Sequence, residues 1–338
     1  MKAAVLIEPR KIEIQDVPDP ALTETKVLVR LRNCGICTLE QRLYRGDLKI
    51  YYPIIPGHEA AGEIVEVGSN VLGDFKAGMP VALDLVTRCG QCYYCRTGSS
   101  NLCSNRFKPG QQVLGGFAEY IAVEGSQVFP LPSGMTFEEA AFTEPVACCI
   151  RSLKKLRVTL GETVLIVGAG PMGLMHLQVA QAMGARVFVS DPDGNRLDVA
   201  TKLGAVGVID PSKEDVKDVV RSNTDGIGVD ACVVTSPAKA ALSSGISALA
   251  KGGRLNIYTS YLEEMPMPLD ANTIHRNESL ITGSEGRTQI DFHQAVRLIS
   301  FGRVQVKPLI SQVVSYDSVN EGIEAAMRPD TLRVLLAQ

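Results

Sequence analysis

The sequence predicts an α/β protein of two domains, in which a doubly wound parallel sheet is joined to a β-rich, barrel-like domain. Three observations lead to this prediction. Short strand-like runs with turn signals fill the first part, and strand-like and helical runs alternate after residue 150. The length of 338 residues also exceeds what one hydrophobic core usually supports. The expected domains are 1–150, completed by the tail 285–338, and 151–284.

In the first part, turn residues such as Pro18-Asp19-Pro20 and Gly68-Ser69-Asn70 separate apolar or alternating runs. Such punctuation is typical of strands in a small barrel-like domain rather than a parallel sheet. The expected strands are Ala3–Ile7, Lys26–Leu31, Gly62–Val67, Val81–Leu85 and Ala118–Val123.

After residue 150 the alternation of β-rich and helical runs predicts a parallel sheet. The expected strands are Thr163–Val167, Arg186–Ser190, Gly207–Ile209, Val229–Thr235, Arg254–Tyr258 and Ser279–Thr282, with helices including Met172–Met183, Asn195–Leu203 and Ala238–Leu249. A helix at Asp291–Phe301 and strands near Leu309–Val314 and Leu332–Leu336 form a tail that we expect to return to the first domain.

Composition excludes several classes of protein. The chain has 34 Lys and Arg against 37 Asp and Glu, a net charge of −3, which argues against a basic nucleic-acid clamp. Hydrophobic residues make up 45%, so the chain is globular rather than disordered. Neither a run of ~18 apolar residues nor a secretory signal is found, and we expect a cytoplasmic protein that contacts no membrane and no nucleic acid.

A glycine fingerprint follows the strand that begins at Thr163. Gly168 allows a tight turn, Gly170 lets backbone approach a pyrophosphate, and Gly173 packs the following helix closely. The helix begins at Pro171-Met172, and its free N–H groups favour phosphate. Asp191, after the next strand, can accept hydrogen bonds from the ribose of NAD and would repel the 2′-phosphate of NADP. The alternative is an ordinary strand–turn–helix with Asp191 as a solvated acid.

Four cysteines lie close together in the sequence, at Cys89, Cys92, Cys95 and Cys103. This spacing lets a loop surround one tetrahedral zinc ion with no open position, which is the pattern of a structural site. The alternatives are disulfides, which a reducing compartment disfavours, and an iron–sulfur cluster.

A second constellation consists of Cys37, His58 and Glu59, with Glu144 on a helical stretch farther along. Three protein ligands plus an open position are the pattern of a catalytic zinc. Taken alone, His58 is more often a turn histidine, and Cys34 with Cys37 could form a redox pair.

These motifs together resemble the zinc-dependent medium-chain dehydrogenase/reductase family. The resemblance rests on Cys34-Gly-Ile-Cys37, Pro56-Gly-His58-Glu59, the four-cysteine lobe, Gly115-Gly-Phe-Ala-Glu-Tyr120, Glu144-Pro145 and the glycine fingerprint, and it spans the chain. It implies a GroES-like catalytic domain completed by the C-terminal tail, and a Rossmann domain. Glu144-Pro145 stands where liver-type alcohol dehydrogenases carry a cysteine, as in the polyol, sugar and threonine dehydrogenase branch.

The resemblance also implies ligands and an activity. Cys37 and His58, with Glu59 or Glu144, would bind the catalytic zinc, so that each chain holds two zinc ions. Tyr44 and Phe117 would line the substrate cleft, unless they only pack, and Arg196 would lie beside the adenine of NAD, unless it is solvated surface.

We expect reversible oxidation of a secondary alcohol in a polyol, cyclitol or sugar-like substrate, with NAD as hydride acceptor, by a homodimer or homotetramer. The alternatives are an L-threonine 3-dehydrogenase-like activity and a non-catalytic cofactor-binding protein.

One position departs from the family pattern. Relatives commonly place Ser or Thr two residues after the zinc cysteine, where the hydroxyl starts a proton relay, and here the residue is Leu39. We therefore expect the proton of the alcohol to leave through a water held by Glu59 or Glu144, with Glu40 and Thr38 as other candidates.

Overall fold

The computed structural model of the chain describes residues 1–48, 50–106, 114–267 and 269–338. These residues form two compact units. Unit 1 comprises Met1–Ala147, Arg287–Gly302 and Val306–Gln338, and unit 2 comprises Cys148–Gly286 and Arg303–Gln305. The boundary after Ala147 falls within helix α4, Thr143–Lys155. Within the described ranges, every helix is too short or too polar to cross a membrane.

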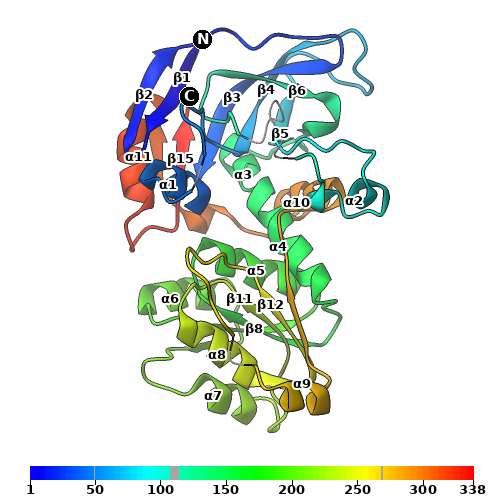
Figure 1. Ribbon diagram of the computed structural model, residues 1–338, viewed down its shortest axis with the longest axis vertical. Helices are drawn as coiled ribbons and strands as arrows, with labels where there is room; N and C mark the ends of the chain where they lie inside the picture. Colours follow the sequence, from blue (N-terminus) through cyan, green and yellow to red (C-terminus); the bar gives the residue numbers. More distant parts are fainter. Residues whose placement is uncertain (49, 107–113, 268) are drawn as a thin grey trace. The chain divides into compact units, whose positions relative to one another are not determined.

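Unit 1 is built on a mixed sheet with the strand order β14-β15-β3-β4-β5-β7, in which β6 also pairs with β3. In Figure 1, β3, β4 and β5 run side by side. Its strands are β3 (Lys26–Ile36), β4 (Glu59–Val67), β5 (Pro80–Asp84), β6 (Tyr120–Glu124), β7 (Val128–Pro130), β14 (Ile310–Ser315) and β15 (Arg333–Ala337). A separate antiparallel pair is formed by β1 (Lys2–Glu8) and β2 (Lys11–Asp16).

Strand β3 is longer than the run expected from the sequence. Beyond Leu31 it continues to Ile36, because Asn33 to Ile36 pair with β15 on one side and part of this segment pairs with β4 on the other. Partners on both sides satisfy the backbone of a segment that includes a polar residue and a glycine. The C-terminal strand β15 therefore completes the sheet of unit 1, and its first residue, Arg333, lies near the end of β3.

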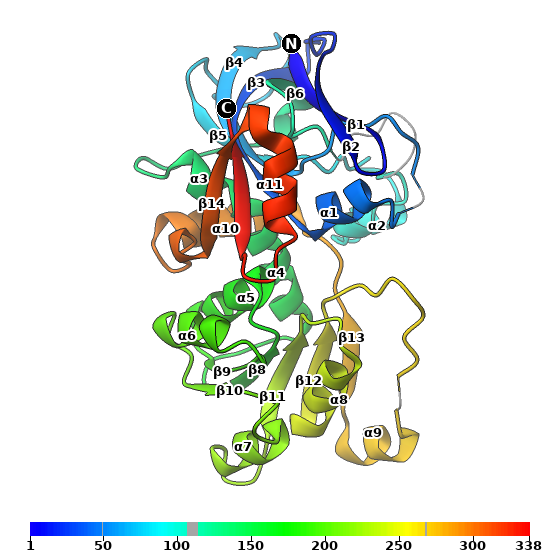
Figure 2. The same ribbon diagram turned by 90° about the vertical axis from the view of Figure 1, so that its left-hand side faces the viewer.

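Unit 1 also contains five complete helices among its described residues, of which all but α2 pack against strands of this sheet. They are α1 (Thr38–Arg45), α2 (Tyr93–Arg96), α3 (Phe137–Ala141), α10 (Gln289–Ser300) and α11 (Val319–Ala326). Single 3₁₀ turns occur at Ser100–Leu102, Gly125–Gln127, Lys307–Leu309 and Tyr316–Ser318. Figure 2 shows α11 against β15. A Cβ at Gly322 would lie 3.1 Å from both Ile36 and Leu336, so the close packing of α11 on the sheet depends on this glycine.

Unit 2 is a parallel six-stranded sheet with the order β10-β9-β8-β11-β12-β13, and β11, β12 and β13 are visible side by side in Figure 2. Its strands are β8 (Thr163–Val167), β9 (Arg186–Ser190), β10 (Gly207–Ile209), β11 (Val229–Val234), β12 (Leu249–Ile257) and β13 (Leu280–Gly283). The connecting helices are α5 (Pro171–Ala182), α6 (Gly194–Lys202), α7 (Val216–Ser222), α8 (Lys239–Ala248) and α9 (Ala271–Asn277). All residues of β8 are buried, as a strand covered on both faces requires. The predicted α/β fold class is confirmed.

Candidate metal centre and cofactor site

Cys37 lies at the junction of β3 and α1, where it is the N-cap residue of the helix. Its Sγ accepts a hydrogen bond from the backbone N–H of Leu39 at 3.2 Å, and the carboxylate of Glu40 accepts one from the N–H of Cys37 at 3.1 Å. This is a capping box in which the side chain of the cap is a thiol. Burial raises the pKa of Cys37 to about 11, whereas the positive end of the helix dipole acts in the opposite direction and favours the thiolate.

Glu40 also holds His58. The Nδ1–H of His58 donates to Oε1 of Glu40 at 2.7 Å, and the N–H of Gly57 donates to the same oxygen at 3.3 Å. Burial lowers the pKa of His58, but Glu40 and Cys37 outweigh burial and raise it well above its usual value. With Nδ1 engaged, Nε2 is the ring nitrogen left for a ligand, and it lies 3.6 Å from Sγ of Cys37.

Glu59 begins β4 and is 2% exposed. A Cβ at Gly35 would lie 2.0 Å from Oε2 of Glu59, so the carboxylate reaches this place only because β3 carries a glycine there. Arg333 forms an ion pair with Oε1 at 3.3 Å. Burial raises the pKa of Glu59 to about 7 although Arg333 opposes it. Ligand atoms of Cys37, His58 and Glu59 all lie within 4.8 Å of one another.

This donor set fits a zinc ion in two respects. Bonds of about 2.3 Å to sulfur and 2.0 Å to nitrogen at a tetrahedral angle imply a sulfur–nitrogen distance of about 3.5 Å, close to the 3.6 Å between Cys37 and His58. In the protonation states that metal binding requires, with His58 neutral and Cys37 ionised, the ligands and the ion pairs described around them comprise five anions and three guanidiniums, a net charge of −2 that a divalent ion would cancel. These groups are Cys37, Glu40, Glu59, Asp84 and Glu144, and Arg88, Arg287 and Arg333.

Glu144 lies in the first turn of α4 and is not part of the converging group found among the described residues. Its carboxylate is instead bound by Nη1 of Arg287. It is nevertheless close enough to raise the pKa of Glu59 by electrostatic repulsion. Of the two acids that the sequence left as alternatives, Glu59 is therefore the one that lies with Cys37 and His58.

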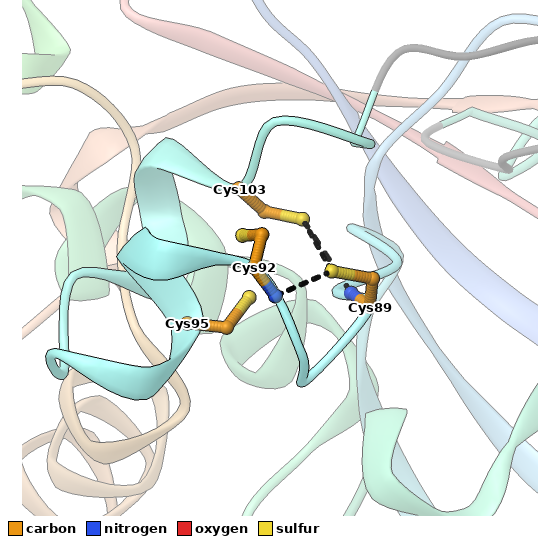
Figure 3. Close-up of side chains that lie close together, drawn as sticks. All are labelled: Cys89, Cys92, Cys95 and Cys103. Carbon is orange, nitrogen blue, oxygen red and sulfur yellow. Dashed lines mark hydrogen bonds between the residues drawn. The ribbon is translucent and has the colours of Figure 1, made fainter.

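The four-cysteine lobe brings its thiols together around a common centre (Figure 3). Sγ of Cys103 lies 3.6 Å from Sγ of Cys89, too far for a disulfide and close to the ~3.8 Å expected for two sulfurs of a tetrahedral zinc. Backbone N–H groups of Cys92 and Cys89 donate to Sγ of Cys89 and of Cys103, each at 3.4 Å. Backbone hydrogen bonds, that of Gln91 first, lower the pKa of Cys89 to about 6, which prepares it as a thiolate.

The glycine fingerprint of unit 2 has the expected geometry. Gly168 has φ +109°, and a Cβ at Gly173 would lie 1.8 Å from the carbonyl oxygen of Gly168, so neither position accepts a side chain. A Cβ at Gly170 would meet only the guanidinium of Arg196, at 3.9 Å. Space is therefore open at the N-cap of α5, whose first turn is Pro171-Met172-Gly173.

Asp191 is 6% exposed and ties this loop together. Its Oδ2 accepts from the N–H of Ala169 at 2.6 Å and its Oδ1 from the N–H of Asp193 at 2.9 Å. Asp191 thus has a structural part in shaping the loop, which the sequence alone did not indicate. Arg196 lies in α6, with its Nε 3.7 Å from Asp193, and extends toward Gly170.

Sequence profiles of two families match the chain. One is described as an alcohol dehydrogenase GroES-like domain and matches residues 23–133, and the other as a zinc-binding dehydrogenase and matches residues 171–300. Sorbitol dehydrogenase of Bacillus subtilis strain 168 is 33% identical over 334 residues, which cover 97% of this chain and 94% of the relative. L-threonine 3-dehydrogenase of Pyrococcus horikoshii is 33% identical over 327 residues, which cover 95% and 92%.

The chain belongs to the zinc-dependent medium-chain dehydrogenase/reductase family. Among solved structures, a protein described as a zinc-binding dehydrogenase from Sinorhizobium meliloti 1021, bound to NADP, superimposes with a TM-score of 0.93 at 28% identity, covering 100% of this chain and 99% of that one. The chain is thus a zinc-dependent, NAD(P)-linked alcohol dehydrogenase.

Two side chains of this dehydrogenase that were expected at the substrate lie in the hydrophobic core of unit 1. Phe117 has no exposed surface, and its ring packs against Gly57. Its position is therefore that of a core residue, the alternative to a place in the substrate cleft. Tyr44 is 9% exposed and belongs to the same core, and a contact with substrate stays a prediction for it. Leu39 packs against that core as well.

Sequence reasoning missed the basic partners of the acids. Arg333 binds Glu59, and Arg287 binds both Glu144 and Asp84. Arg88 binds the other oxygen of Asp84 at 2.6 Å. Each of these arginines has at least one partner that is far away in the sequence, so the pairs depend on the fold rather than on a local pattern.

Proposed function

We propose that this dehydrogenase oxidises a secondary alcohol in a polyol, cyclitol or sugar-like substrate and transfers the hydride to NAD. Cys37, His58 and Glu59 hold the catalytic zinc, and Cys89, Cys92, Cys95 and Cys103 hold the structural one. Gly168, Gly170, Gly173 and Asp191 bind NAD, with Pro171, Met172 and Arg196 beside them. The catalytic domain comprises 1–150 and 285–338, and the NAD-binding domain 151–284.

One observation favours a neutral, hydroxylated substrate over threonine. The guanidiniums beside the metal ligands are already bound to protein groups: Arg287 to Glu144 and Asp84, and Arg333 to Glu59 and the carbonyl of Ile36. An amino acid substrate needs a cation for its carboxylate, and exchanging these buried pairs for a new one is costly. A polyol only requires hydrogen-bonding groups, which the carboxylates supply.

The protein groups have distinct parts in the reaction. When bound, zinc supplies a Lewis acid that favours loss of the alcohol proton near neutral pH. Glu40 fixes the tautomer of His58 that leaves Nε2 free, and Arg333 restrains Glu59. Glu144, outside the ligand group and adjacent to it, is the carboxylate placed to accept the proton directly or through one water. Leu39 carries no exchangeable proton, so Leu39→Thr should change turnover little.

A panel of polyols, sugars and L-threonine tests this function through NADH formation. We expect turnover with one or more polyols or sugars and little with threonine. Cys37→Ser and His58→Ala should abolish turnover while NAD binding to unit 2 persists, because the cofactor loop contains neither residue. Preferred turnover of threonine would establish the alternative substrate class. Lack of turnover with any alcohol at full zinc occupancy would instead favour the non-catalytic alternative.

We propose a homodimer or homotetramer in the cytoplasm. The edge strand β13 supports the assembly, because it ends the sheet of unit 2 and exposes 43% of Leu280. Light scattering of the purified enzyme tests it, and a monomer at micromolar concentration would contradict it.

A further inference from the structure

A buried line of four charged side chains leads from Glu144 to the four-cysteine lobe. Arg287 binds Glu144 through Nη1 and Oδ1 of Asp84 through Nη2, the latter at 2.8 Å. Arg88 then binds Oδ2 of Asp84 at 2.6 Å. The four side chains are between 0% and 7% exposed. All belong to unit 1, although they come from three separate segments of the chain, since Asp84 and Arg88 are only four residues apart.

The guanidinium of Arg88 contacts three groups. Its Nη1 binds Asp84 and donates to the carbonyl of Val86 at 3.1 Å, and its Nη2 donates to the backbone carbonyl of Arg287 at 2.8 Å. Arg287 is thus held at both ends: Asp84 binds its guanidinium, and Arg88 binds its backbone carbonyl. Because both oxygens of Asp84 are engaged, the carboxylate cannot rotate without breaking a buried ion pair, which is strongly destabilising.

The lobe begins directly after this line. Arg88 is followed by Cys89, whose N–H donates to Sγ of Cys103 and whose Sγ accepts from the N–H of Cys92. A metal bound by the four thiols therefore restrains the backbone on one side of Arg88, and the Asp84 pair restrains its side chain on the other.

We infer that Asp84 and Arg88 are positioning residues for Glu144 and that they act through Arg287. Metal in the four-cysteine lobe helps to hold Arg88, and thereby the other three side chains, in place. The lobe then contributes to catalysis as well as to stability. The inference rests on the proposed role of Glu144 as proton acceptor. A merely structural role would lower stability on substitution but would not depend on Glu144.

A double-mutant cycle separates these cases. Arg88→Met removes all three contacts and keeps much of the side-chain volume. We expect kcat to fall about 10- to 100-fold, as for other groups that orient a metal-site residue, with KM and NAD affinity little changed. In a Glu144→Gln background, Arg88→Met should cause no further fall. Asp84→Asn, which weakens the same ion pairs, should lower kcat in the same way and with the same dependence on Glu144. Arg88→Lys, which keeps the positive charge, should retain more of the wild-type kcat than Arg88→Met.

A matched control comes from unit 2. Arg254 binds a carboxylate, that of Glu162 at 2.6 Å, and a backbone carbonyl, that of Leu156 at 2.9 Å, much as Arg88 does. Arg254→Met should lower the melting temperature without the dependence on Glu144. A crystal structure of Arg88→Met, independent of activity, should show the Arg287–Glu144 pair displaced.

The role of the four-cysteine lobe is tested by a second double-mutant cycle, in which Cys103→Ser is combined with Glu144→Gln. Loss of the lobe metal should lower kcat in the wild-type background and much less in the Glu144→Gln background. Equal effects of Arg88→Met in both backgrounds, or an unchanged kcat in the folded variant, would overturn the inference. If Glu144→Gln itself has wild-type kcat, the proposed proton acceptor fails first, and the two failures are thereby distinguished.

Discussion

Glu40→Gln is the substitution that most directly tests how the chain builds its catalytic metal site. The carboxylate accepts three hydrogen bonds, from Nδ1–H of His58, from the N–H of Gly57 and from the N–H of Cys37. Glutamine is nearly isosteric but offers one acceptor oxygen and one donor amide. No orientation of that amide satisfies all three donors.

The two orientations fail in different ways. With the oxygen toward His58, the amide faces the N–H of Cys37, and the capping box is lost. With the oxygen toward Cys37, the amide faces His58, which must then accept at Nδ1 and carry its proton on Nε2, where it cannot bind metal. A buried donor without an acceptor costs about 1–3 kcal/mol, which corresponds to a loss of zinc affinity of about 5- to 150-fold.

Competition between the enzyme and a chromophoric chelator measures this affinity, with the lobe fully loaded. Glu139→Gln is the matched control, because Glu139 closes the same kind of capping box at α3, with the N–H of Thr136 at 2.9 Å, and contacts no metal ligand. Wild-type zinc affinity in Glu40→Gln, or an equal loss in Glu139→Gln, would refute the reasoning.

Three further predictions follow from the same structure. Metal analysis should find two zinc ions per chain, and the four-cysteine lobe should retain its ion longer against a chelator because it has no open position. Zinc binding to the apo enzyme should also release protons, since burial raises the pKa of Cys37 to about 11. Wild type should prefer NAD to NADP, and Asp191→Ser should narrow that preference while weakening NAD binding, because it also removes two loop hydrogen bonds; equal efficiency of wild type with both cofactors would contradict this. Burial lowers the pKa of His176 from 6.5 to about 4, so below pH 6.5 the unfolded chain takes up a proton at this side chain that the folded chain does not. Urea titrations should show that this proton lowers the free energy of unfolding by roughly 3 kcal/mol between pH 7 and 4, and His176→Phe should lack this contribution.

The sequence predicted those features that depend on local pattern. Strands β8 and β9 have the expected bounds, since a buried parallel strand is a continuous apolar run. The glycine positions follow from backbone geometry, and the four cysteines from their spacing alone. Cys37, His58 and Glu59 converge because two of them are adjacent and the third begins a helix that the capping box fixes.

Other features depend on which distant segments pair. Glu40 could be named as a proton-route candidate, but its bond to His58 requires the register of β3 and β4, which bulges shift. Arg333 reaches Glu59 only because the last strand of the chain pairs with β3. Phe117 looked like a substrate residue in the sequence and is core in the structure, since an aromatic side chain fits either environment.

The buried ion pairs around Cys37, His58 and Glu59 are better explained by the proposed metal than by fold stability. Buried pairs of this kind seldom stabilise a fold more than apolar residues of the same volume would. In the protonation states that metal binding requires, with His58 neutral and Cys37 ionised, the anions Cys37, Glu40 and Glu59 exceed their guanidinium partner, Arg333. A divalent ion held by Cys37, His58 and Glu59, as proposed, would remove the excess at the point where it is greatest. Arg333 and Arg287 can then restrain Glu59 and Glu144 without neutralising the ligand set on which that ion depends.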